Sequence, residues 1–241
     1  GYKWMMRDLK FQSGQYKMFA GMPHFIKKLI HAGASPLLNA KNLELASDFI
    51  RRGVENEKFY WSGQSIYSPT HQNKLFNPNF KHLSQLPYRF VSKMYADSDK
   101  LHANSDDLQQ MLFLELSHRL SETLLMRVDK IGMAHSIEAR VPFLDHRIVE
   151  FSMSIPQRLK VPDGKTTKYL LKKAVEPILP NNIIYRKKQG FAAPTNEWLR
   201  NQWYSYASEN ILNSSFSKLG IINKDYMKSI LENHKSGKTN S

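Results

Sequence analysis

Apolar residues recur at intervals of three and four along most of the chain, whereas strict alternation of apolar and polar residues is nearly absent. The first spacing is typical of amphipathic helices and the second of strands. We therefore predict one helix over Pro23–His31, ended by Gly33, and another over about Asn42–Val54. A polar, aromatic-rich loop is expected over Tyr60–His82, where glycine and proline give turn chemistry.

The strongest helical pattern begins after Asn104-Ser105, a pair suited to cap a helix. Asp106 and Asp107 follow, where the positive end of the helix dipole favours acids. Apolar residues then occupy most sides of the helix, and the pattern extends to about Met126. We expect this helix to be central and buried.

One further helix is predicted over Leu144–Ser154, and a second should begin after a cap at Thr166 or Thr167. A third is predicted from Thr195-Asn196 through Trp198 and Trp203, and the last begins after Asn223. The helix capped at Thr166 or Thr167 should end near Pro177 or Pro180, because proline cannot continue a helix. One short segment, Asn182–Tyr185, is expected to be extended. The coarse prediction is a mainly α chain.

Composition narrows the possible classes of protein. The 241 residues carry 35 Lys and Arg against 21 Asp and Glu, a net charge of +14 that favours a polyanionic partner such as the phosphates of a nucleotide. With no cysteine, the chain has no disulfide, thiolate zinc site or cysteine nucleophile. No stretch approaches the roughly 18 apolar residues of a membrane span, so we expect no membrane partner. The lack of cysteine fits a cytoplasmic location.

Residues 129–145 read DKIGMAHSIEARVPFLD, a segment in which an acid and a base stand among small and apolar residues. Pro142 restrains the residue before it to an extended conformation, so one continuous helix cannot run through this segment. Asp145 is suited to cap the helix that follows. Burial of Glu138 would raise the pKa of its carboxyl and suit it to acid–base chemistry. The alternative is that Glu138 and Arg140 form ion pairs with a structural role only.

Residues 185–194 read YRKKQGFAAP, in which the three adjacent cations Arg186, Lys187 and Lys188 precede Gly190. Such cations bind phosphates, arginine as a planar fork and lysine as a point charge. Gly190 permits close approach of the backbone to a ligand. The alternative is a solvated basic loop anchored by Phe191 and Trp198.

Together the two segments resemble the synthetase domain of the glutamine-dependent asparagine synthetase family, which reads D-x-x-x-M-A-x-S-x-E-A-R-x-P-F-L-D followed by R-x-K-x-G-F-x-x-P. Gly164-Lys165-Thr166-Thr167-Lys168 is similar to the G-K-x-x-K of that family. The detailed match covers about residues 124–198. The resemblance implies that residues 1–241 are the helical C-terminal portion of an α/β domain of the adenine-nucleotide α-hydrolase-like (ATP pyrophosphatase) type, whose parallel sheet is largely missing from these residues.

The resemblance also implies a reaction and residues that carry it. In the family, ATP with Mg²⁺ activates the side-chain carboxylate of aspartate as an acyl-adenylate, and ammonia then displaces AMP to give asparagine. By this resemblance Lys188 would stabilise charge on the phosphates and the leaving pyrophosphate, and Glu138 would take the proton of the ammonia. Arg186 and Lys168 are further candidates to bind ATP or pyrophosphate. No metal ligand is assigned.

The sequence departs from the family pattern in three places. The S-G-G-x-D-S loop that binds phosphate is not found in it, the acidic D-G-G-D-E-L-F-x-G-Y segment is represented only by Gly1-Tyr2, and there is no cysteine for a glutaminase. Ammonia would therefore come from a glutaminase domain outside these residues. We expect the 241 residues to be inactive by themselves and to expose the apolar face that would cover the sheet.

Two alternative functions remain open. Within the family, the acceptor would be another carboxylate, such as a sugar acid or a peptide, because the two motifs do not specify aspartate. Outside it, the charge and the basic runs Arg186–Lys188 and Lys168–Lys173 suggest a module that binds nucleic acid, although no helix-turn-helix or zinc-finger pattern accompanies them. A scaffold that retains the motifs without activity is a third alternative. The sequence does not specify the oligomeric state.

Overall fold

The computed structural model describes residues 3–40, 43–61, 69–101, 105–187 and 193–238, and these residues are mainly helical with no strand among them. They form two units. The first comprises residues 1–66 and 88–186, and the second residues 67–87 and 187–241. The predicted α class is confirmed.

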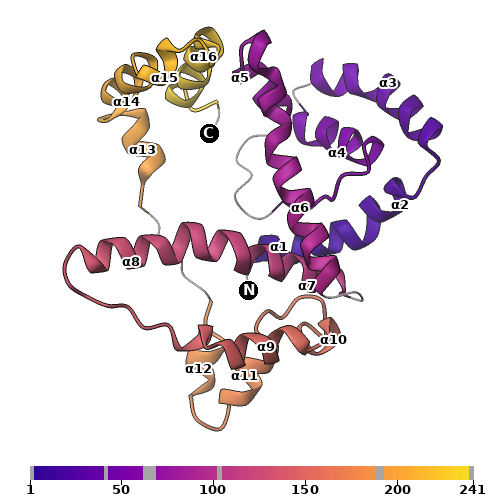
Figure 1. Ribbon diagram of the computed structural model, residues 1–241, viewed down its shortest axis with the longest axis vertical. Helices are drawn as coiled ribbons and strands as arrows, with labels where there is room; N and C mark the ends of the chain where they lie inside the picture. The colour runs from indigo at the N-terminus through magenta and orange to yellow at the C-terminus, as the bar shows by residue number, and fades with distance from the viewer. Residues whose placement is uncertain (1–2, 41–42, 62–68, 102–104, 188–192, 239–241) are drawn as a thin grey trace. The chain divides into compact units, whose positions relative to one another are not determined.

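The helices of the first unit are shown in Figure 1. They are α1 Lys3–Phe11, α2 Lys17–Ala20, α3 His24–Ala40, α4 Glu44–Val54, nearly all of α6 Leu86–Leu101, α7 Asp107–Leu114, α8 Met126–Met133, α9 His146–Ser154, α10 Gln157–Lys160, α11 Tyr169–Val175 and α12 Asn181–Ile184. Two π-helical segments, η1 Gln12–Tyr16 and η3 Glu115–Leu125, and the 3-10 turn η4 Pro142–Leu144 complete it.

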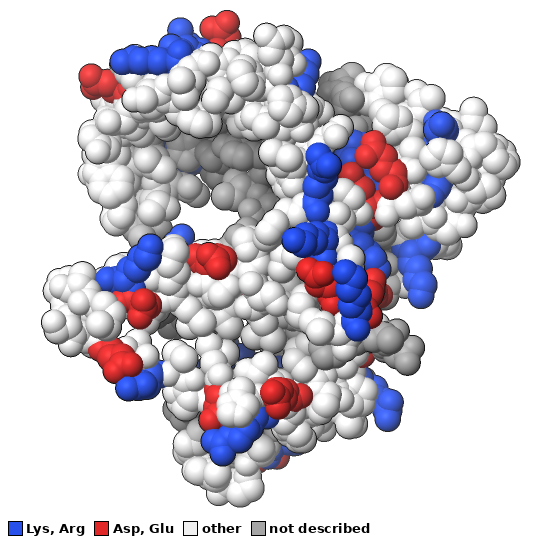
Figure 2. Space-filling model, in the orientation of Figure 1, with Lys and Arg blue, Asp and Glu red and all other residues white. Residues whose placement is uncertain are grey.

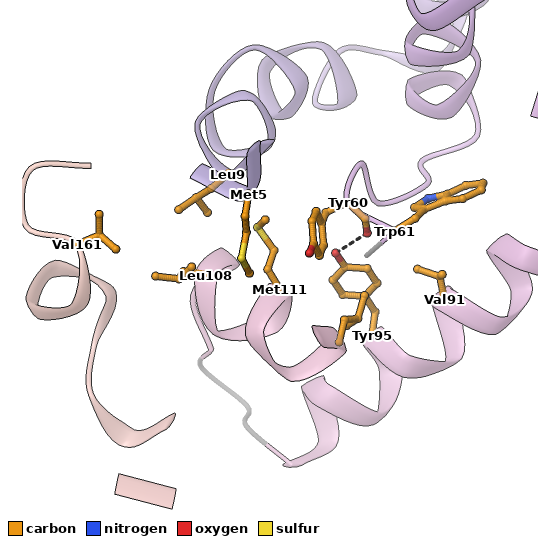
Figure 3. Packing of buried hydrophobic residues seen from close by; sticks show 10 residues of the cluster. Met5, Leu9, Tyr60, Trp61, Val91, Tyr95, Leu108, Met111 and Val161 are labelled. Carbon is orange, nitrogen blue, oxygen red and sulfur yellow. Dashed lines mark hydrogen bonds between the residues drawn. The ribbon is translucent and has the colours of Figure 1, made fainter. Parts of the chain in front are cut away.

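The core of the first unit lies where α1, α6 and α7 meet the segment after α4 (Figure 3). Met111 is fully buried and Leu114 is 1% exposed, so the predicted burial of the α7 region is confirmed. Burying each such side chain contributes about 2 kcal/mol. The other core residues are Met5, Leu9, Tyr60, Trp61, Val91, Tyr95, Leu108 and Val161.

The helix predicted after Asn104-Ser105 runs through α7, η3 and α8 and therefore extends beyond Met126 to Met133. Asn104 lies outside the described residues, and the cap is Asp106. The Asp106 side chain accepts a hydrogen bond from the backbone N–H of Gln109, whose side chain accepts one in return from the Asp106 N–H. This reciprocal capping box fixes the start of the helix one residue later than expected.

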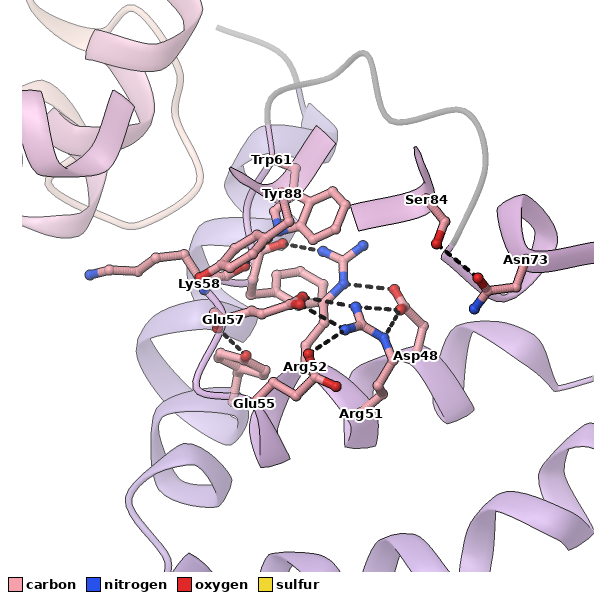
Figure 4. A network of polar contacts seen from close by, with 12 residues as sticks. Asp48, Arg51, Arg52, Glu55, Glu57, Lys58, Trp61, Asn73, Ser84 and Tyr88 are labelled. Carbon is pink, nitrogen blue, oxygen red and sulfur yellow. Dashed lines mark hydrogen bonds and ion pairs between the residues drawn. The ribbon is translucent and has the colours of Figure 1, made fainter. Parts of the chain in front are cut away.

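A polar cluster joins α4 to the segment that follows it (Figure 4). Arg51 donates to both carboxylate oxygens of Glu57 at 2.7 and 2.8 Å, and also to Asp48. Arg52 donates to Asp48 at 2.6 Å and lies over the Trp61 ring at 3.9 Å. Burial raises the pKa of Glu57, and its hydrogen bonds to Arg51 oppose that rise. The cluster holds Trp61 against the end of α4.

Several predicted boundaries are wrong for identifiable reasons. α3 continues through Gly33, because the backbone hydrogen bonds of the helix outweigh the cost of about 1 kcal/mol for one interior glycine. The predicted loop Tyr60–His82 contains helix α5, and its first residue, Tyr60, belongs to the core. Residues 182–185, expected to be extended, lie largely in the single helical turn α12, which follows Pro180. The N–H groups of Ile183 and Ile184 donate to the carbonyl of Pro180, which closes this turn.

The second unit consists of α5 Pro69–Leu75, the 3-10 segment η2 Pro78–Gln85, α13 Thr195–Arg200, α14 Tyr204–Leu212, α15 Ser215–Lys218 and α16 Lys224–Lys235. Asn223 caps α16 by accepting from the N–H groups of Asp225 and Tyr226, as predicted. The single predicted helix through Trp198 and Trp203 is two helices, α13 and α14, which meet where the two indole rings pack 4.9 Å apart. An isolated antiparallel bridge joins Phe76 to Ile222.

The surface is mixed in charge and rich in apolar side chains. Lys and Arg alternate with Asp and Glu over the face seen in Figure 2 and form no single basic patch there. Between Leu124 and Tyr185 many large apolar side chains are exposed, among them Phe143 at 67% and Ile178 at 76%. Exposed apolar side chains are thus present in this stretch, and a single apolar face that covers a sheet stays a prediction. None of the helices in the described ranges is long and apolar enough to cross a membrane.

Candidate active site

The segment that carries Glu138 lies between the end of α8 and the start of α9. α8 ends in a turn in which the N–H groups of His135 and Ile137 both donate to the carbonyl of Gly132. Ser136 adopts the left-handed conformation, with φ of 57°, which reverses the chain. The chain is then irregular from Ile137 to the 3-10 turn η4, and Val141 has φ of −123°. The predicted break in the helix is therefore confirmed.

Gly132 makes this turn possible. A Cβ at this position would lie 2.6 Å from the carbonyl oxygen of Ile137, closer than a side chain tolerates. The chain after the turn passes directly against the end of α8 at a place where only hydrogen fits. Gly132 thus fixes where the chain leaves α8 before it reaches Glu138. This role of Gly132 was not predicted, although the residue belongs to the motif.

Glu138 and Arg140 are paired with each other. The Arg140 guanidinium donates to Oε2 of Glu138 at 2.8 Å, and the two side chains are 82% and 62% exposed, respectively. The expected burial of Glu138 in an apolar frame is wrong for the described residues, because Ile137, Val141 and Phe143 are themselves exposed. An exposed pair of this kind contributes about 0–1 kcal/mol to stability. The carboxylate is accessible to solvent and to small molecules.

Asp145 caps α9 as predicted. One of its carboxylate oxygens accepts from the backbone N–H of Arg147 at 3.0 Å. The Arg147 guanidinium donates to both oxygens, at 2.9 and 2.8 Å. These hydrogen bonds from Arg147 lower the pKa of Asp145. The cap anchors the C-terminal end of the segment that bears Glu138, as the turn at Gly132 anchors its N-terminal end.

Of the second motif, residues 185–194, the structure describes only the two ends, 185–187 and 193–194. Lys188 and Gly190 lie outside the described residues, and so does Phe191. Arg186 is exposed at the end of the first unit, whereas Lys187 and Pro194 belong to the second. Before them, the Tyr185 hydroxyl is hydrogen-bonded to Glu176, which also pairs with Lys173 at 2.9 Å. The role of Lys188 stays a prediction.

Lys168 is exposed and adopts the left-handed conformation with φ of 58°, immediately before α11. The predicted cap at Thr166 or Thr167 is wrong, because Thr166 is held in the preceding turn. Its N–H and hydroxyl both donate to Asp163, and these bonds lower the pKa of Asp163 to about 2. Among the described residues, no hydrogen bond or ion pair is seen between Lys168 and Glu138 or Arg186; the hydrogen-bond partner of Glu138 is Arg140.

The described ranges contain no group of three or more His, Asp or Glu side chains that could hold a metal ion.

Comparison of the sequence with protein families and with curated proteins points to the same family in both cases. The family model for asparagine synthase matches residues 15–241. Asparagine synthetase [glutamine-hydrolyzing] 1 of Bacillus subtilis is 36% identical over 168 residues, which are 70% of this chain and 25% of that protein. Asparagine synthetase [glutamine-hydrolyzing] 3 of the same organism is 38% identical over 100 residues, 38% of this chain and 16% of that protein.

The human asparagine synthetase [glutamine-hydrolyzing] is 32% identical over 103 residues, 40% of this chain and 18% of that protein. No solved structure gives a significant match. The chain spans about a quarter or less of the length of these three relatives. Since the family match extends over nearly all of its residues, the chain belongs to the asparagine synthase family.

Proposed function

We propose that this chain is part of an asparagine synthetase that converts the side-chain carboxylate of aspartate to an amide, with ATP cleaved to AMP and pyrophosphate. The observation that carries this proposal is the position of Glu138. Its exposed carboxylate stands on a short segment between two α-helices, fixed at one end by the Gly132 turn and at the other by the Asp145 cap. A solvent-accessible base on a fixed segment suits proton transfer to or from a small substrate.

The role proposed for Glu138 follows from the charge balance of amide formation. When ammonia attacks the acyl carbon of an acyl-adenylate, a C–N bond forms, the C–O bond to AMP breaks and the nitrogen must lose a proton. Glu138 would accept that proton. Its present partner, Arg140, is exposed and bonded at 2.8 Å through one nitrogen, so the pair can separate at little cost.

The cations of the second motif would act earlier, during adenylation. Negative charge builds up on the pyrophosphate as the acceptor carboxylate attacks the α-phosphorus, and a positioned cation stabilises that charge. We assign this role first to Lys188, with Arg186 and Lys168 as further candidates. The ATP pyrophosphatase type of fold and the use of glutamine-derived ammonia belong to the same proposal.

Because the S-G-G-x-D-S loop is not in the sequence, we expect the 241 residues alone to release no AMP. The test therefore uses the full-length product of the gene that encodes them, supplied with aspartate, ammonium and ATP. Lys188→Ala should lower pyrophosphate release itself by about 10²–10³-fold, the usual cost of removing one stabilising group. Glu138→Gln should lower asparagine formation more than pyrophosphate release.

Matched controls are the neighbouring cation, Lys187→Ala, and an exposed glutamate on α9, Glu150→Gln. Both should leave the ratio of asparagine to pyrophosphate unchanged. If Lys188→Ala and Glu138→Gln both retain normal asparagine synthesis, the assignment of the site is wrong. Amidation of a uronic acid in preference to aspartate would move the chain to the other acceptor class within the family.

A further inference from the structure

A polar contact joins the ends of α11 and α12. α11 ends at Val175, and the chain returns through the single turn α12 to Tyr185. The Tyr185 hydroxyl donates a hydrogen bond to Oε1 of Glu176, the residue that directly follows α11. The two residues stand nine positions apart, so this bond closes a short loop just before the second motif continues with Arg186.

Two lysines of α11 complete this contact. Lys173 donates to the same Oε1 atom of Glu176 at 2.9 Å, and Nζ of Lys172 lies 5.3 Å from the centroid of the Tyr185 ring. The bonds from Lys173 and Tyr185 lower the pKa of Glu176, and the bond to Glu176 raises the pKa of Tyr185. At neutral pH the carboxylate is therefore the acceptor and the tyrosine keeps the proton that it donates.

Apolar packing does not hold Tyr185 in place. Within the described residues, neither α11 nor α12 has a buried side chain. Tyr185 itself is 47% exposed, and Ile178 and Ile183, which lie between it and Glu176, are 76% and 51% exposed. The position of Tyr185 therefore depends on its polar contacts with α11 and with Glu176.

Arg186 follows Tyr185 directly and is exposed. Among the described residues, no hydrogen bond or ion pair engages its guanidinium. Glu176, the acid that stands beside this segment, already accepts from Tyr185 and Lys173. The guanidinium is thus available to an anionic ligand. Because it binds phosphate oxygens best through two parallel hydrogen bonds, its affinity depends on how the backbone before it is oriented.

We propose that Tyr185 and Glu176 are positioning residues, which hold the backbone before Arg186 so that its guanidinium is directed at a phosphate group of ATP or pyrophosphate. Neither residue touches the ligand, and both act through Arg186. The inference rests on the part of the proposed function that assigns Arg186 to phosphate binding, and it does not depend on which carboxylate is amidated.

The test measures the affinity of the full-length gene product for inorganic pyrophosphate by titration calorimetry. Arg186→Met should weaken binding by about tenfold, because it removes charge-assisted hydrogen bonds. Tyr185→Phe removes only a hydroxyl group and keeps the ring beneath Lys172. It should weaken binding by about fivefold, the effect expected for the loss of one hydrogen bond. Glu176→Gln, which removes the charge of the acceptor, should act in the same direction.

The double variant separates positioning from a general structural effect. If the Tyr185 hydroxyl acts through Arg186, Tyr185→Phe should have no further effect in the Arg186→Met background. The matched control is Tyr206→Phe, which removes the hydroxyl of a tyrosine that is 73% exposed on α14 and should leave the affinity unchanged. All these variants should keep the urea unfolding midpoint of the wild type, since exposed polar contacts contribute little to stability.

The possible results distinguish this inference from the proposed amidation, which is tested separately by asparagine formation. Weaker binding in Tyr185→Phe that vanishes in the Arg186→Met background supports the positioning role, whatever the acceptor. Unchanged affinity in Tyr185→Phe, beside a loss in Arg186→Met, overturns the positioning role alone. An equal loss in both backgrounds also overturns it, because the hydroxyl would then act by another route. If wild type shows no saturable binding, or Arg186→Met no loss, the assignment of Arg186 fails and the inference fails with it.

Discussion

Removing the charge of Asp48 should destabilise the first unit strongly, because Asp48 is the carboxylate that pairs with a buried arginine. The side chains of Asp48 and Arg52 are 7% and 9% exposed, and they are joined at 2.6 Å. In Asp48→Asn, Arg51 keeps its two hydrogen bonds to Glu57. Arg52 loses its charged partner and keeps the carbonyl of Phe59 and the ring contacts.

The expected loss in the free energy of unfolding follows from the ion pair that Arg52 loses. Breaking a buried ion pair by removing one partner costs about 3–5 kcal/mol, because the remaining charge is buried and uncompensated. Since asparagine still offers one acceptor oxygen, we expect the lower end, about 3 kcal/mol. With an m-value of about 3 kcal/mol/M for urea, the unfolding midpoint of the first unit would fall by about 1 M.

The assay is urea unfolding of the 241-residue chain, followed by circular dichroism. The matched control is Asp97→Asn, which removes the same charge from an exposed pair, Lys100–Asp97 at 3.7 Å, and should shift the midpoint by less than about 0.3 M, as expected for a pair worth about 0–1 kcal/mol. If Asp48→Asn shifts the midpoint no more than Asp97→Asn does, the cluster around α4 does not stabilise the fold in the way argued from its burial.

Three further outcomes are expected. Asp106→Ala removes the capping box of α7 and should cost about 0.5–2 kcal/mol in the same urea assay; no loss would mean that the cap is not formed. Met111→Ala, in the fully buried core position, should cost about 2–5 kcal/mol, and a cost below 1 kcal/mol would contradict that burial. The Asp163 carboxyl should titrate by NMR near pH 2, and in Thr166→Val, which removes the hydroxyl donor, at higher pH. Because folding lowers this pKa, the stabilisation from Asp163 is present above about pH 4 and is lost as the pH falls towards 2.

Much of the helical framework could be predicted from the spacing of apolar residues. α4, α9, α16 and the long helix beginning with α7 were expected close to where they lie, because each has a clear apolar periodicity or a capping residue at its start. The boundaries that failed depend on local competition between hydrogen bonds. The Thr166 side chain, for example, bonds to Asp163 in the preceding turn, and α11 begins instead after Lys168.

The core was harder to predict, because tertiary packing decides which aromatic residues become buried. Tyr60 is 2% exposed and Trp61 is 6% exposed, although both stand in a segment with the composition of a loop. α1 was not predicted at all, yet Met5 and Leu9, four residues apart, place one face of it in the core. That spacing was the signal available in the sequence.

In the candidate site, too, features set by local chemistry were predictable and features set by tertiary packing were not. The turn before Glu138, the break at Pro142 and the Asp145 cap follow from local chemistry, and the break and the cap were predicted. The exposure of Glu138 was not, since it depends on whether the apolar residues beside it are covered.

The most direct test of the proposed chemistry follows an oxygen atom. Full-length enzyme is supplied with ATP, ammonium and aspartate labelled with ¹⁸O in the side-chain carboxylate, and AMP is analysed by mass spectrometry. If the carboxylate attacks the α-phosphorus and ammonia then breaks the acyl C–O bond, one labelled oxygen stays on phosphorus, and AMP gains one ¹⁸O for each asparagine formed. Asparagine formed with unlabelled AMP, or with ADP and labelled inorganic phosphate, would contradict the acyl-adenylate and the roles assigned to Glu138 and Lys188.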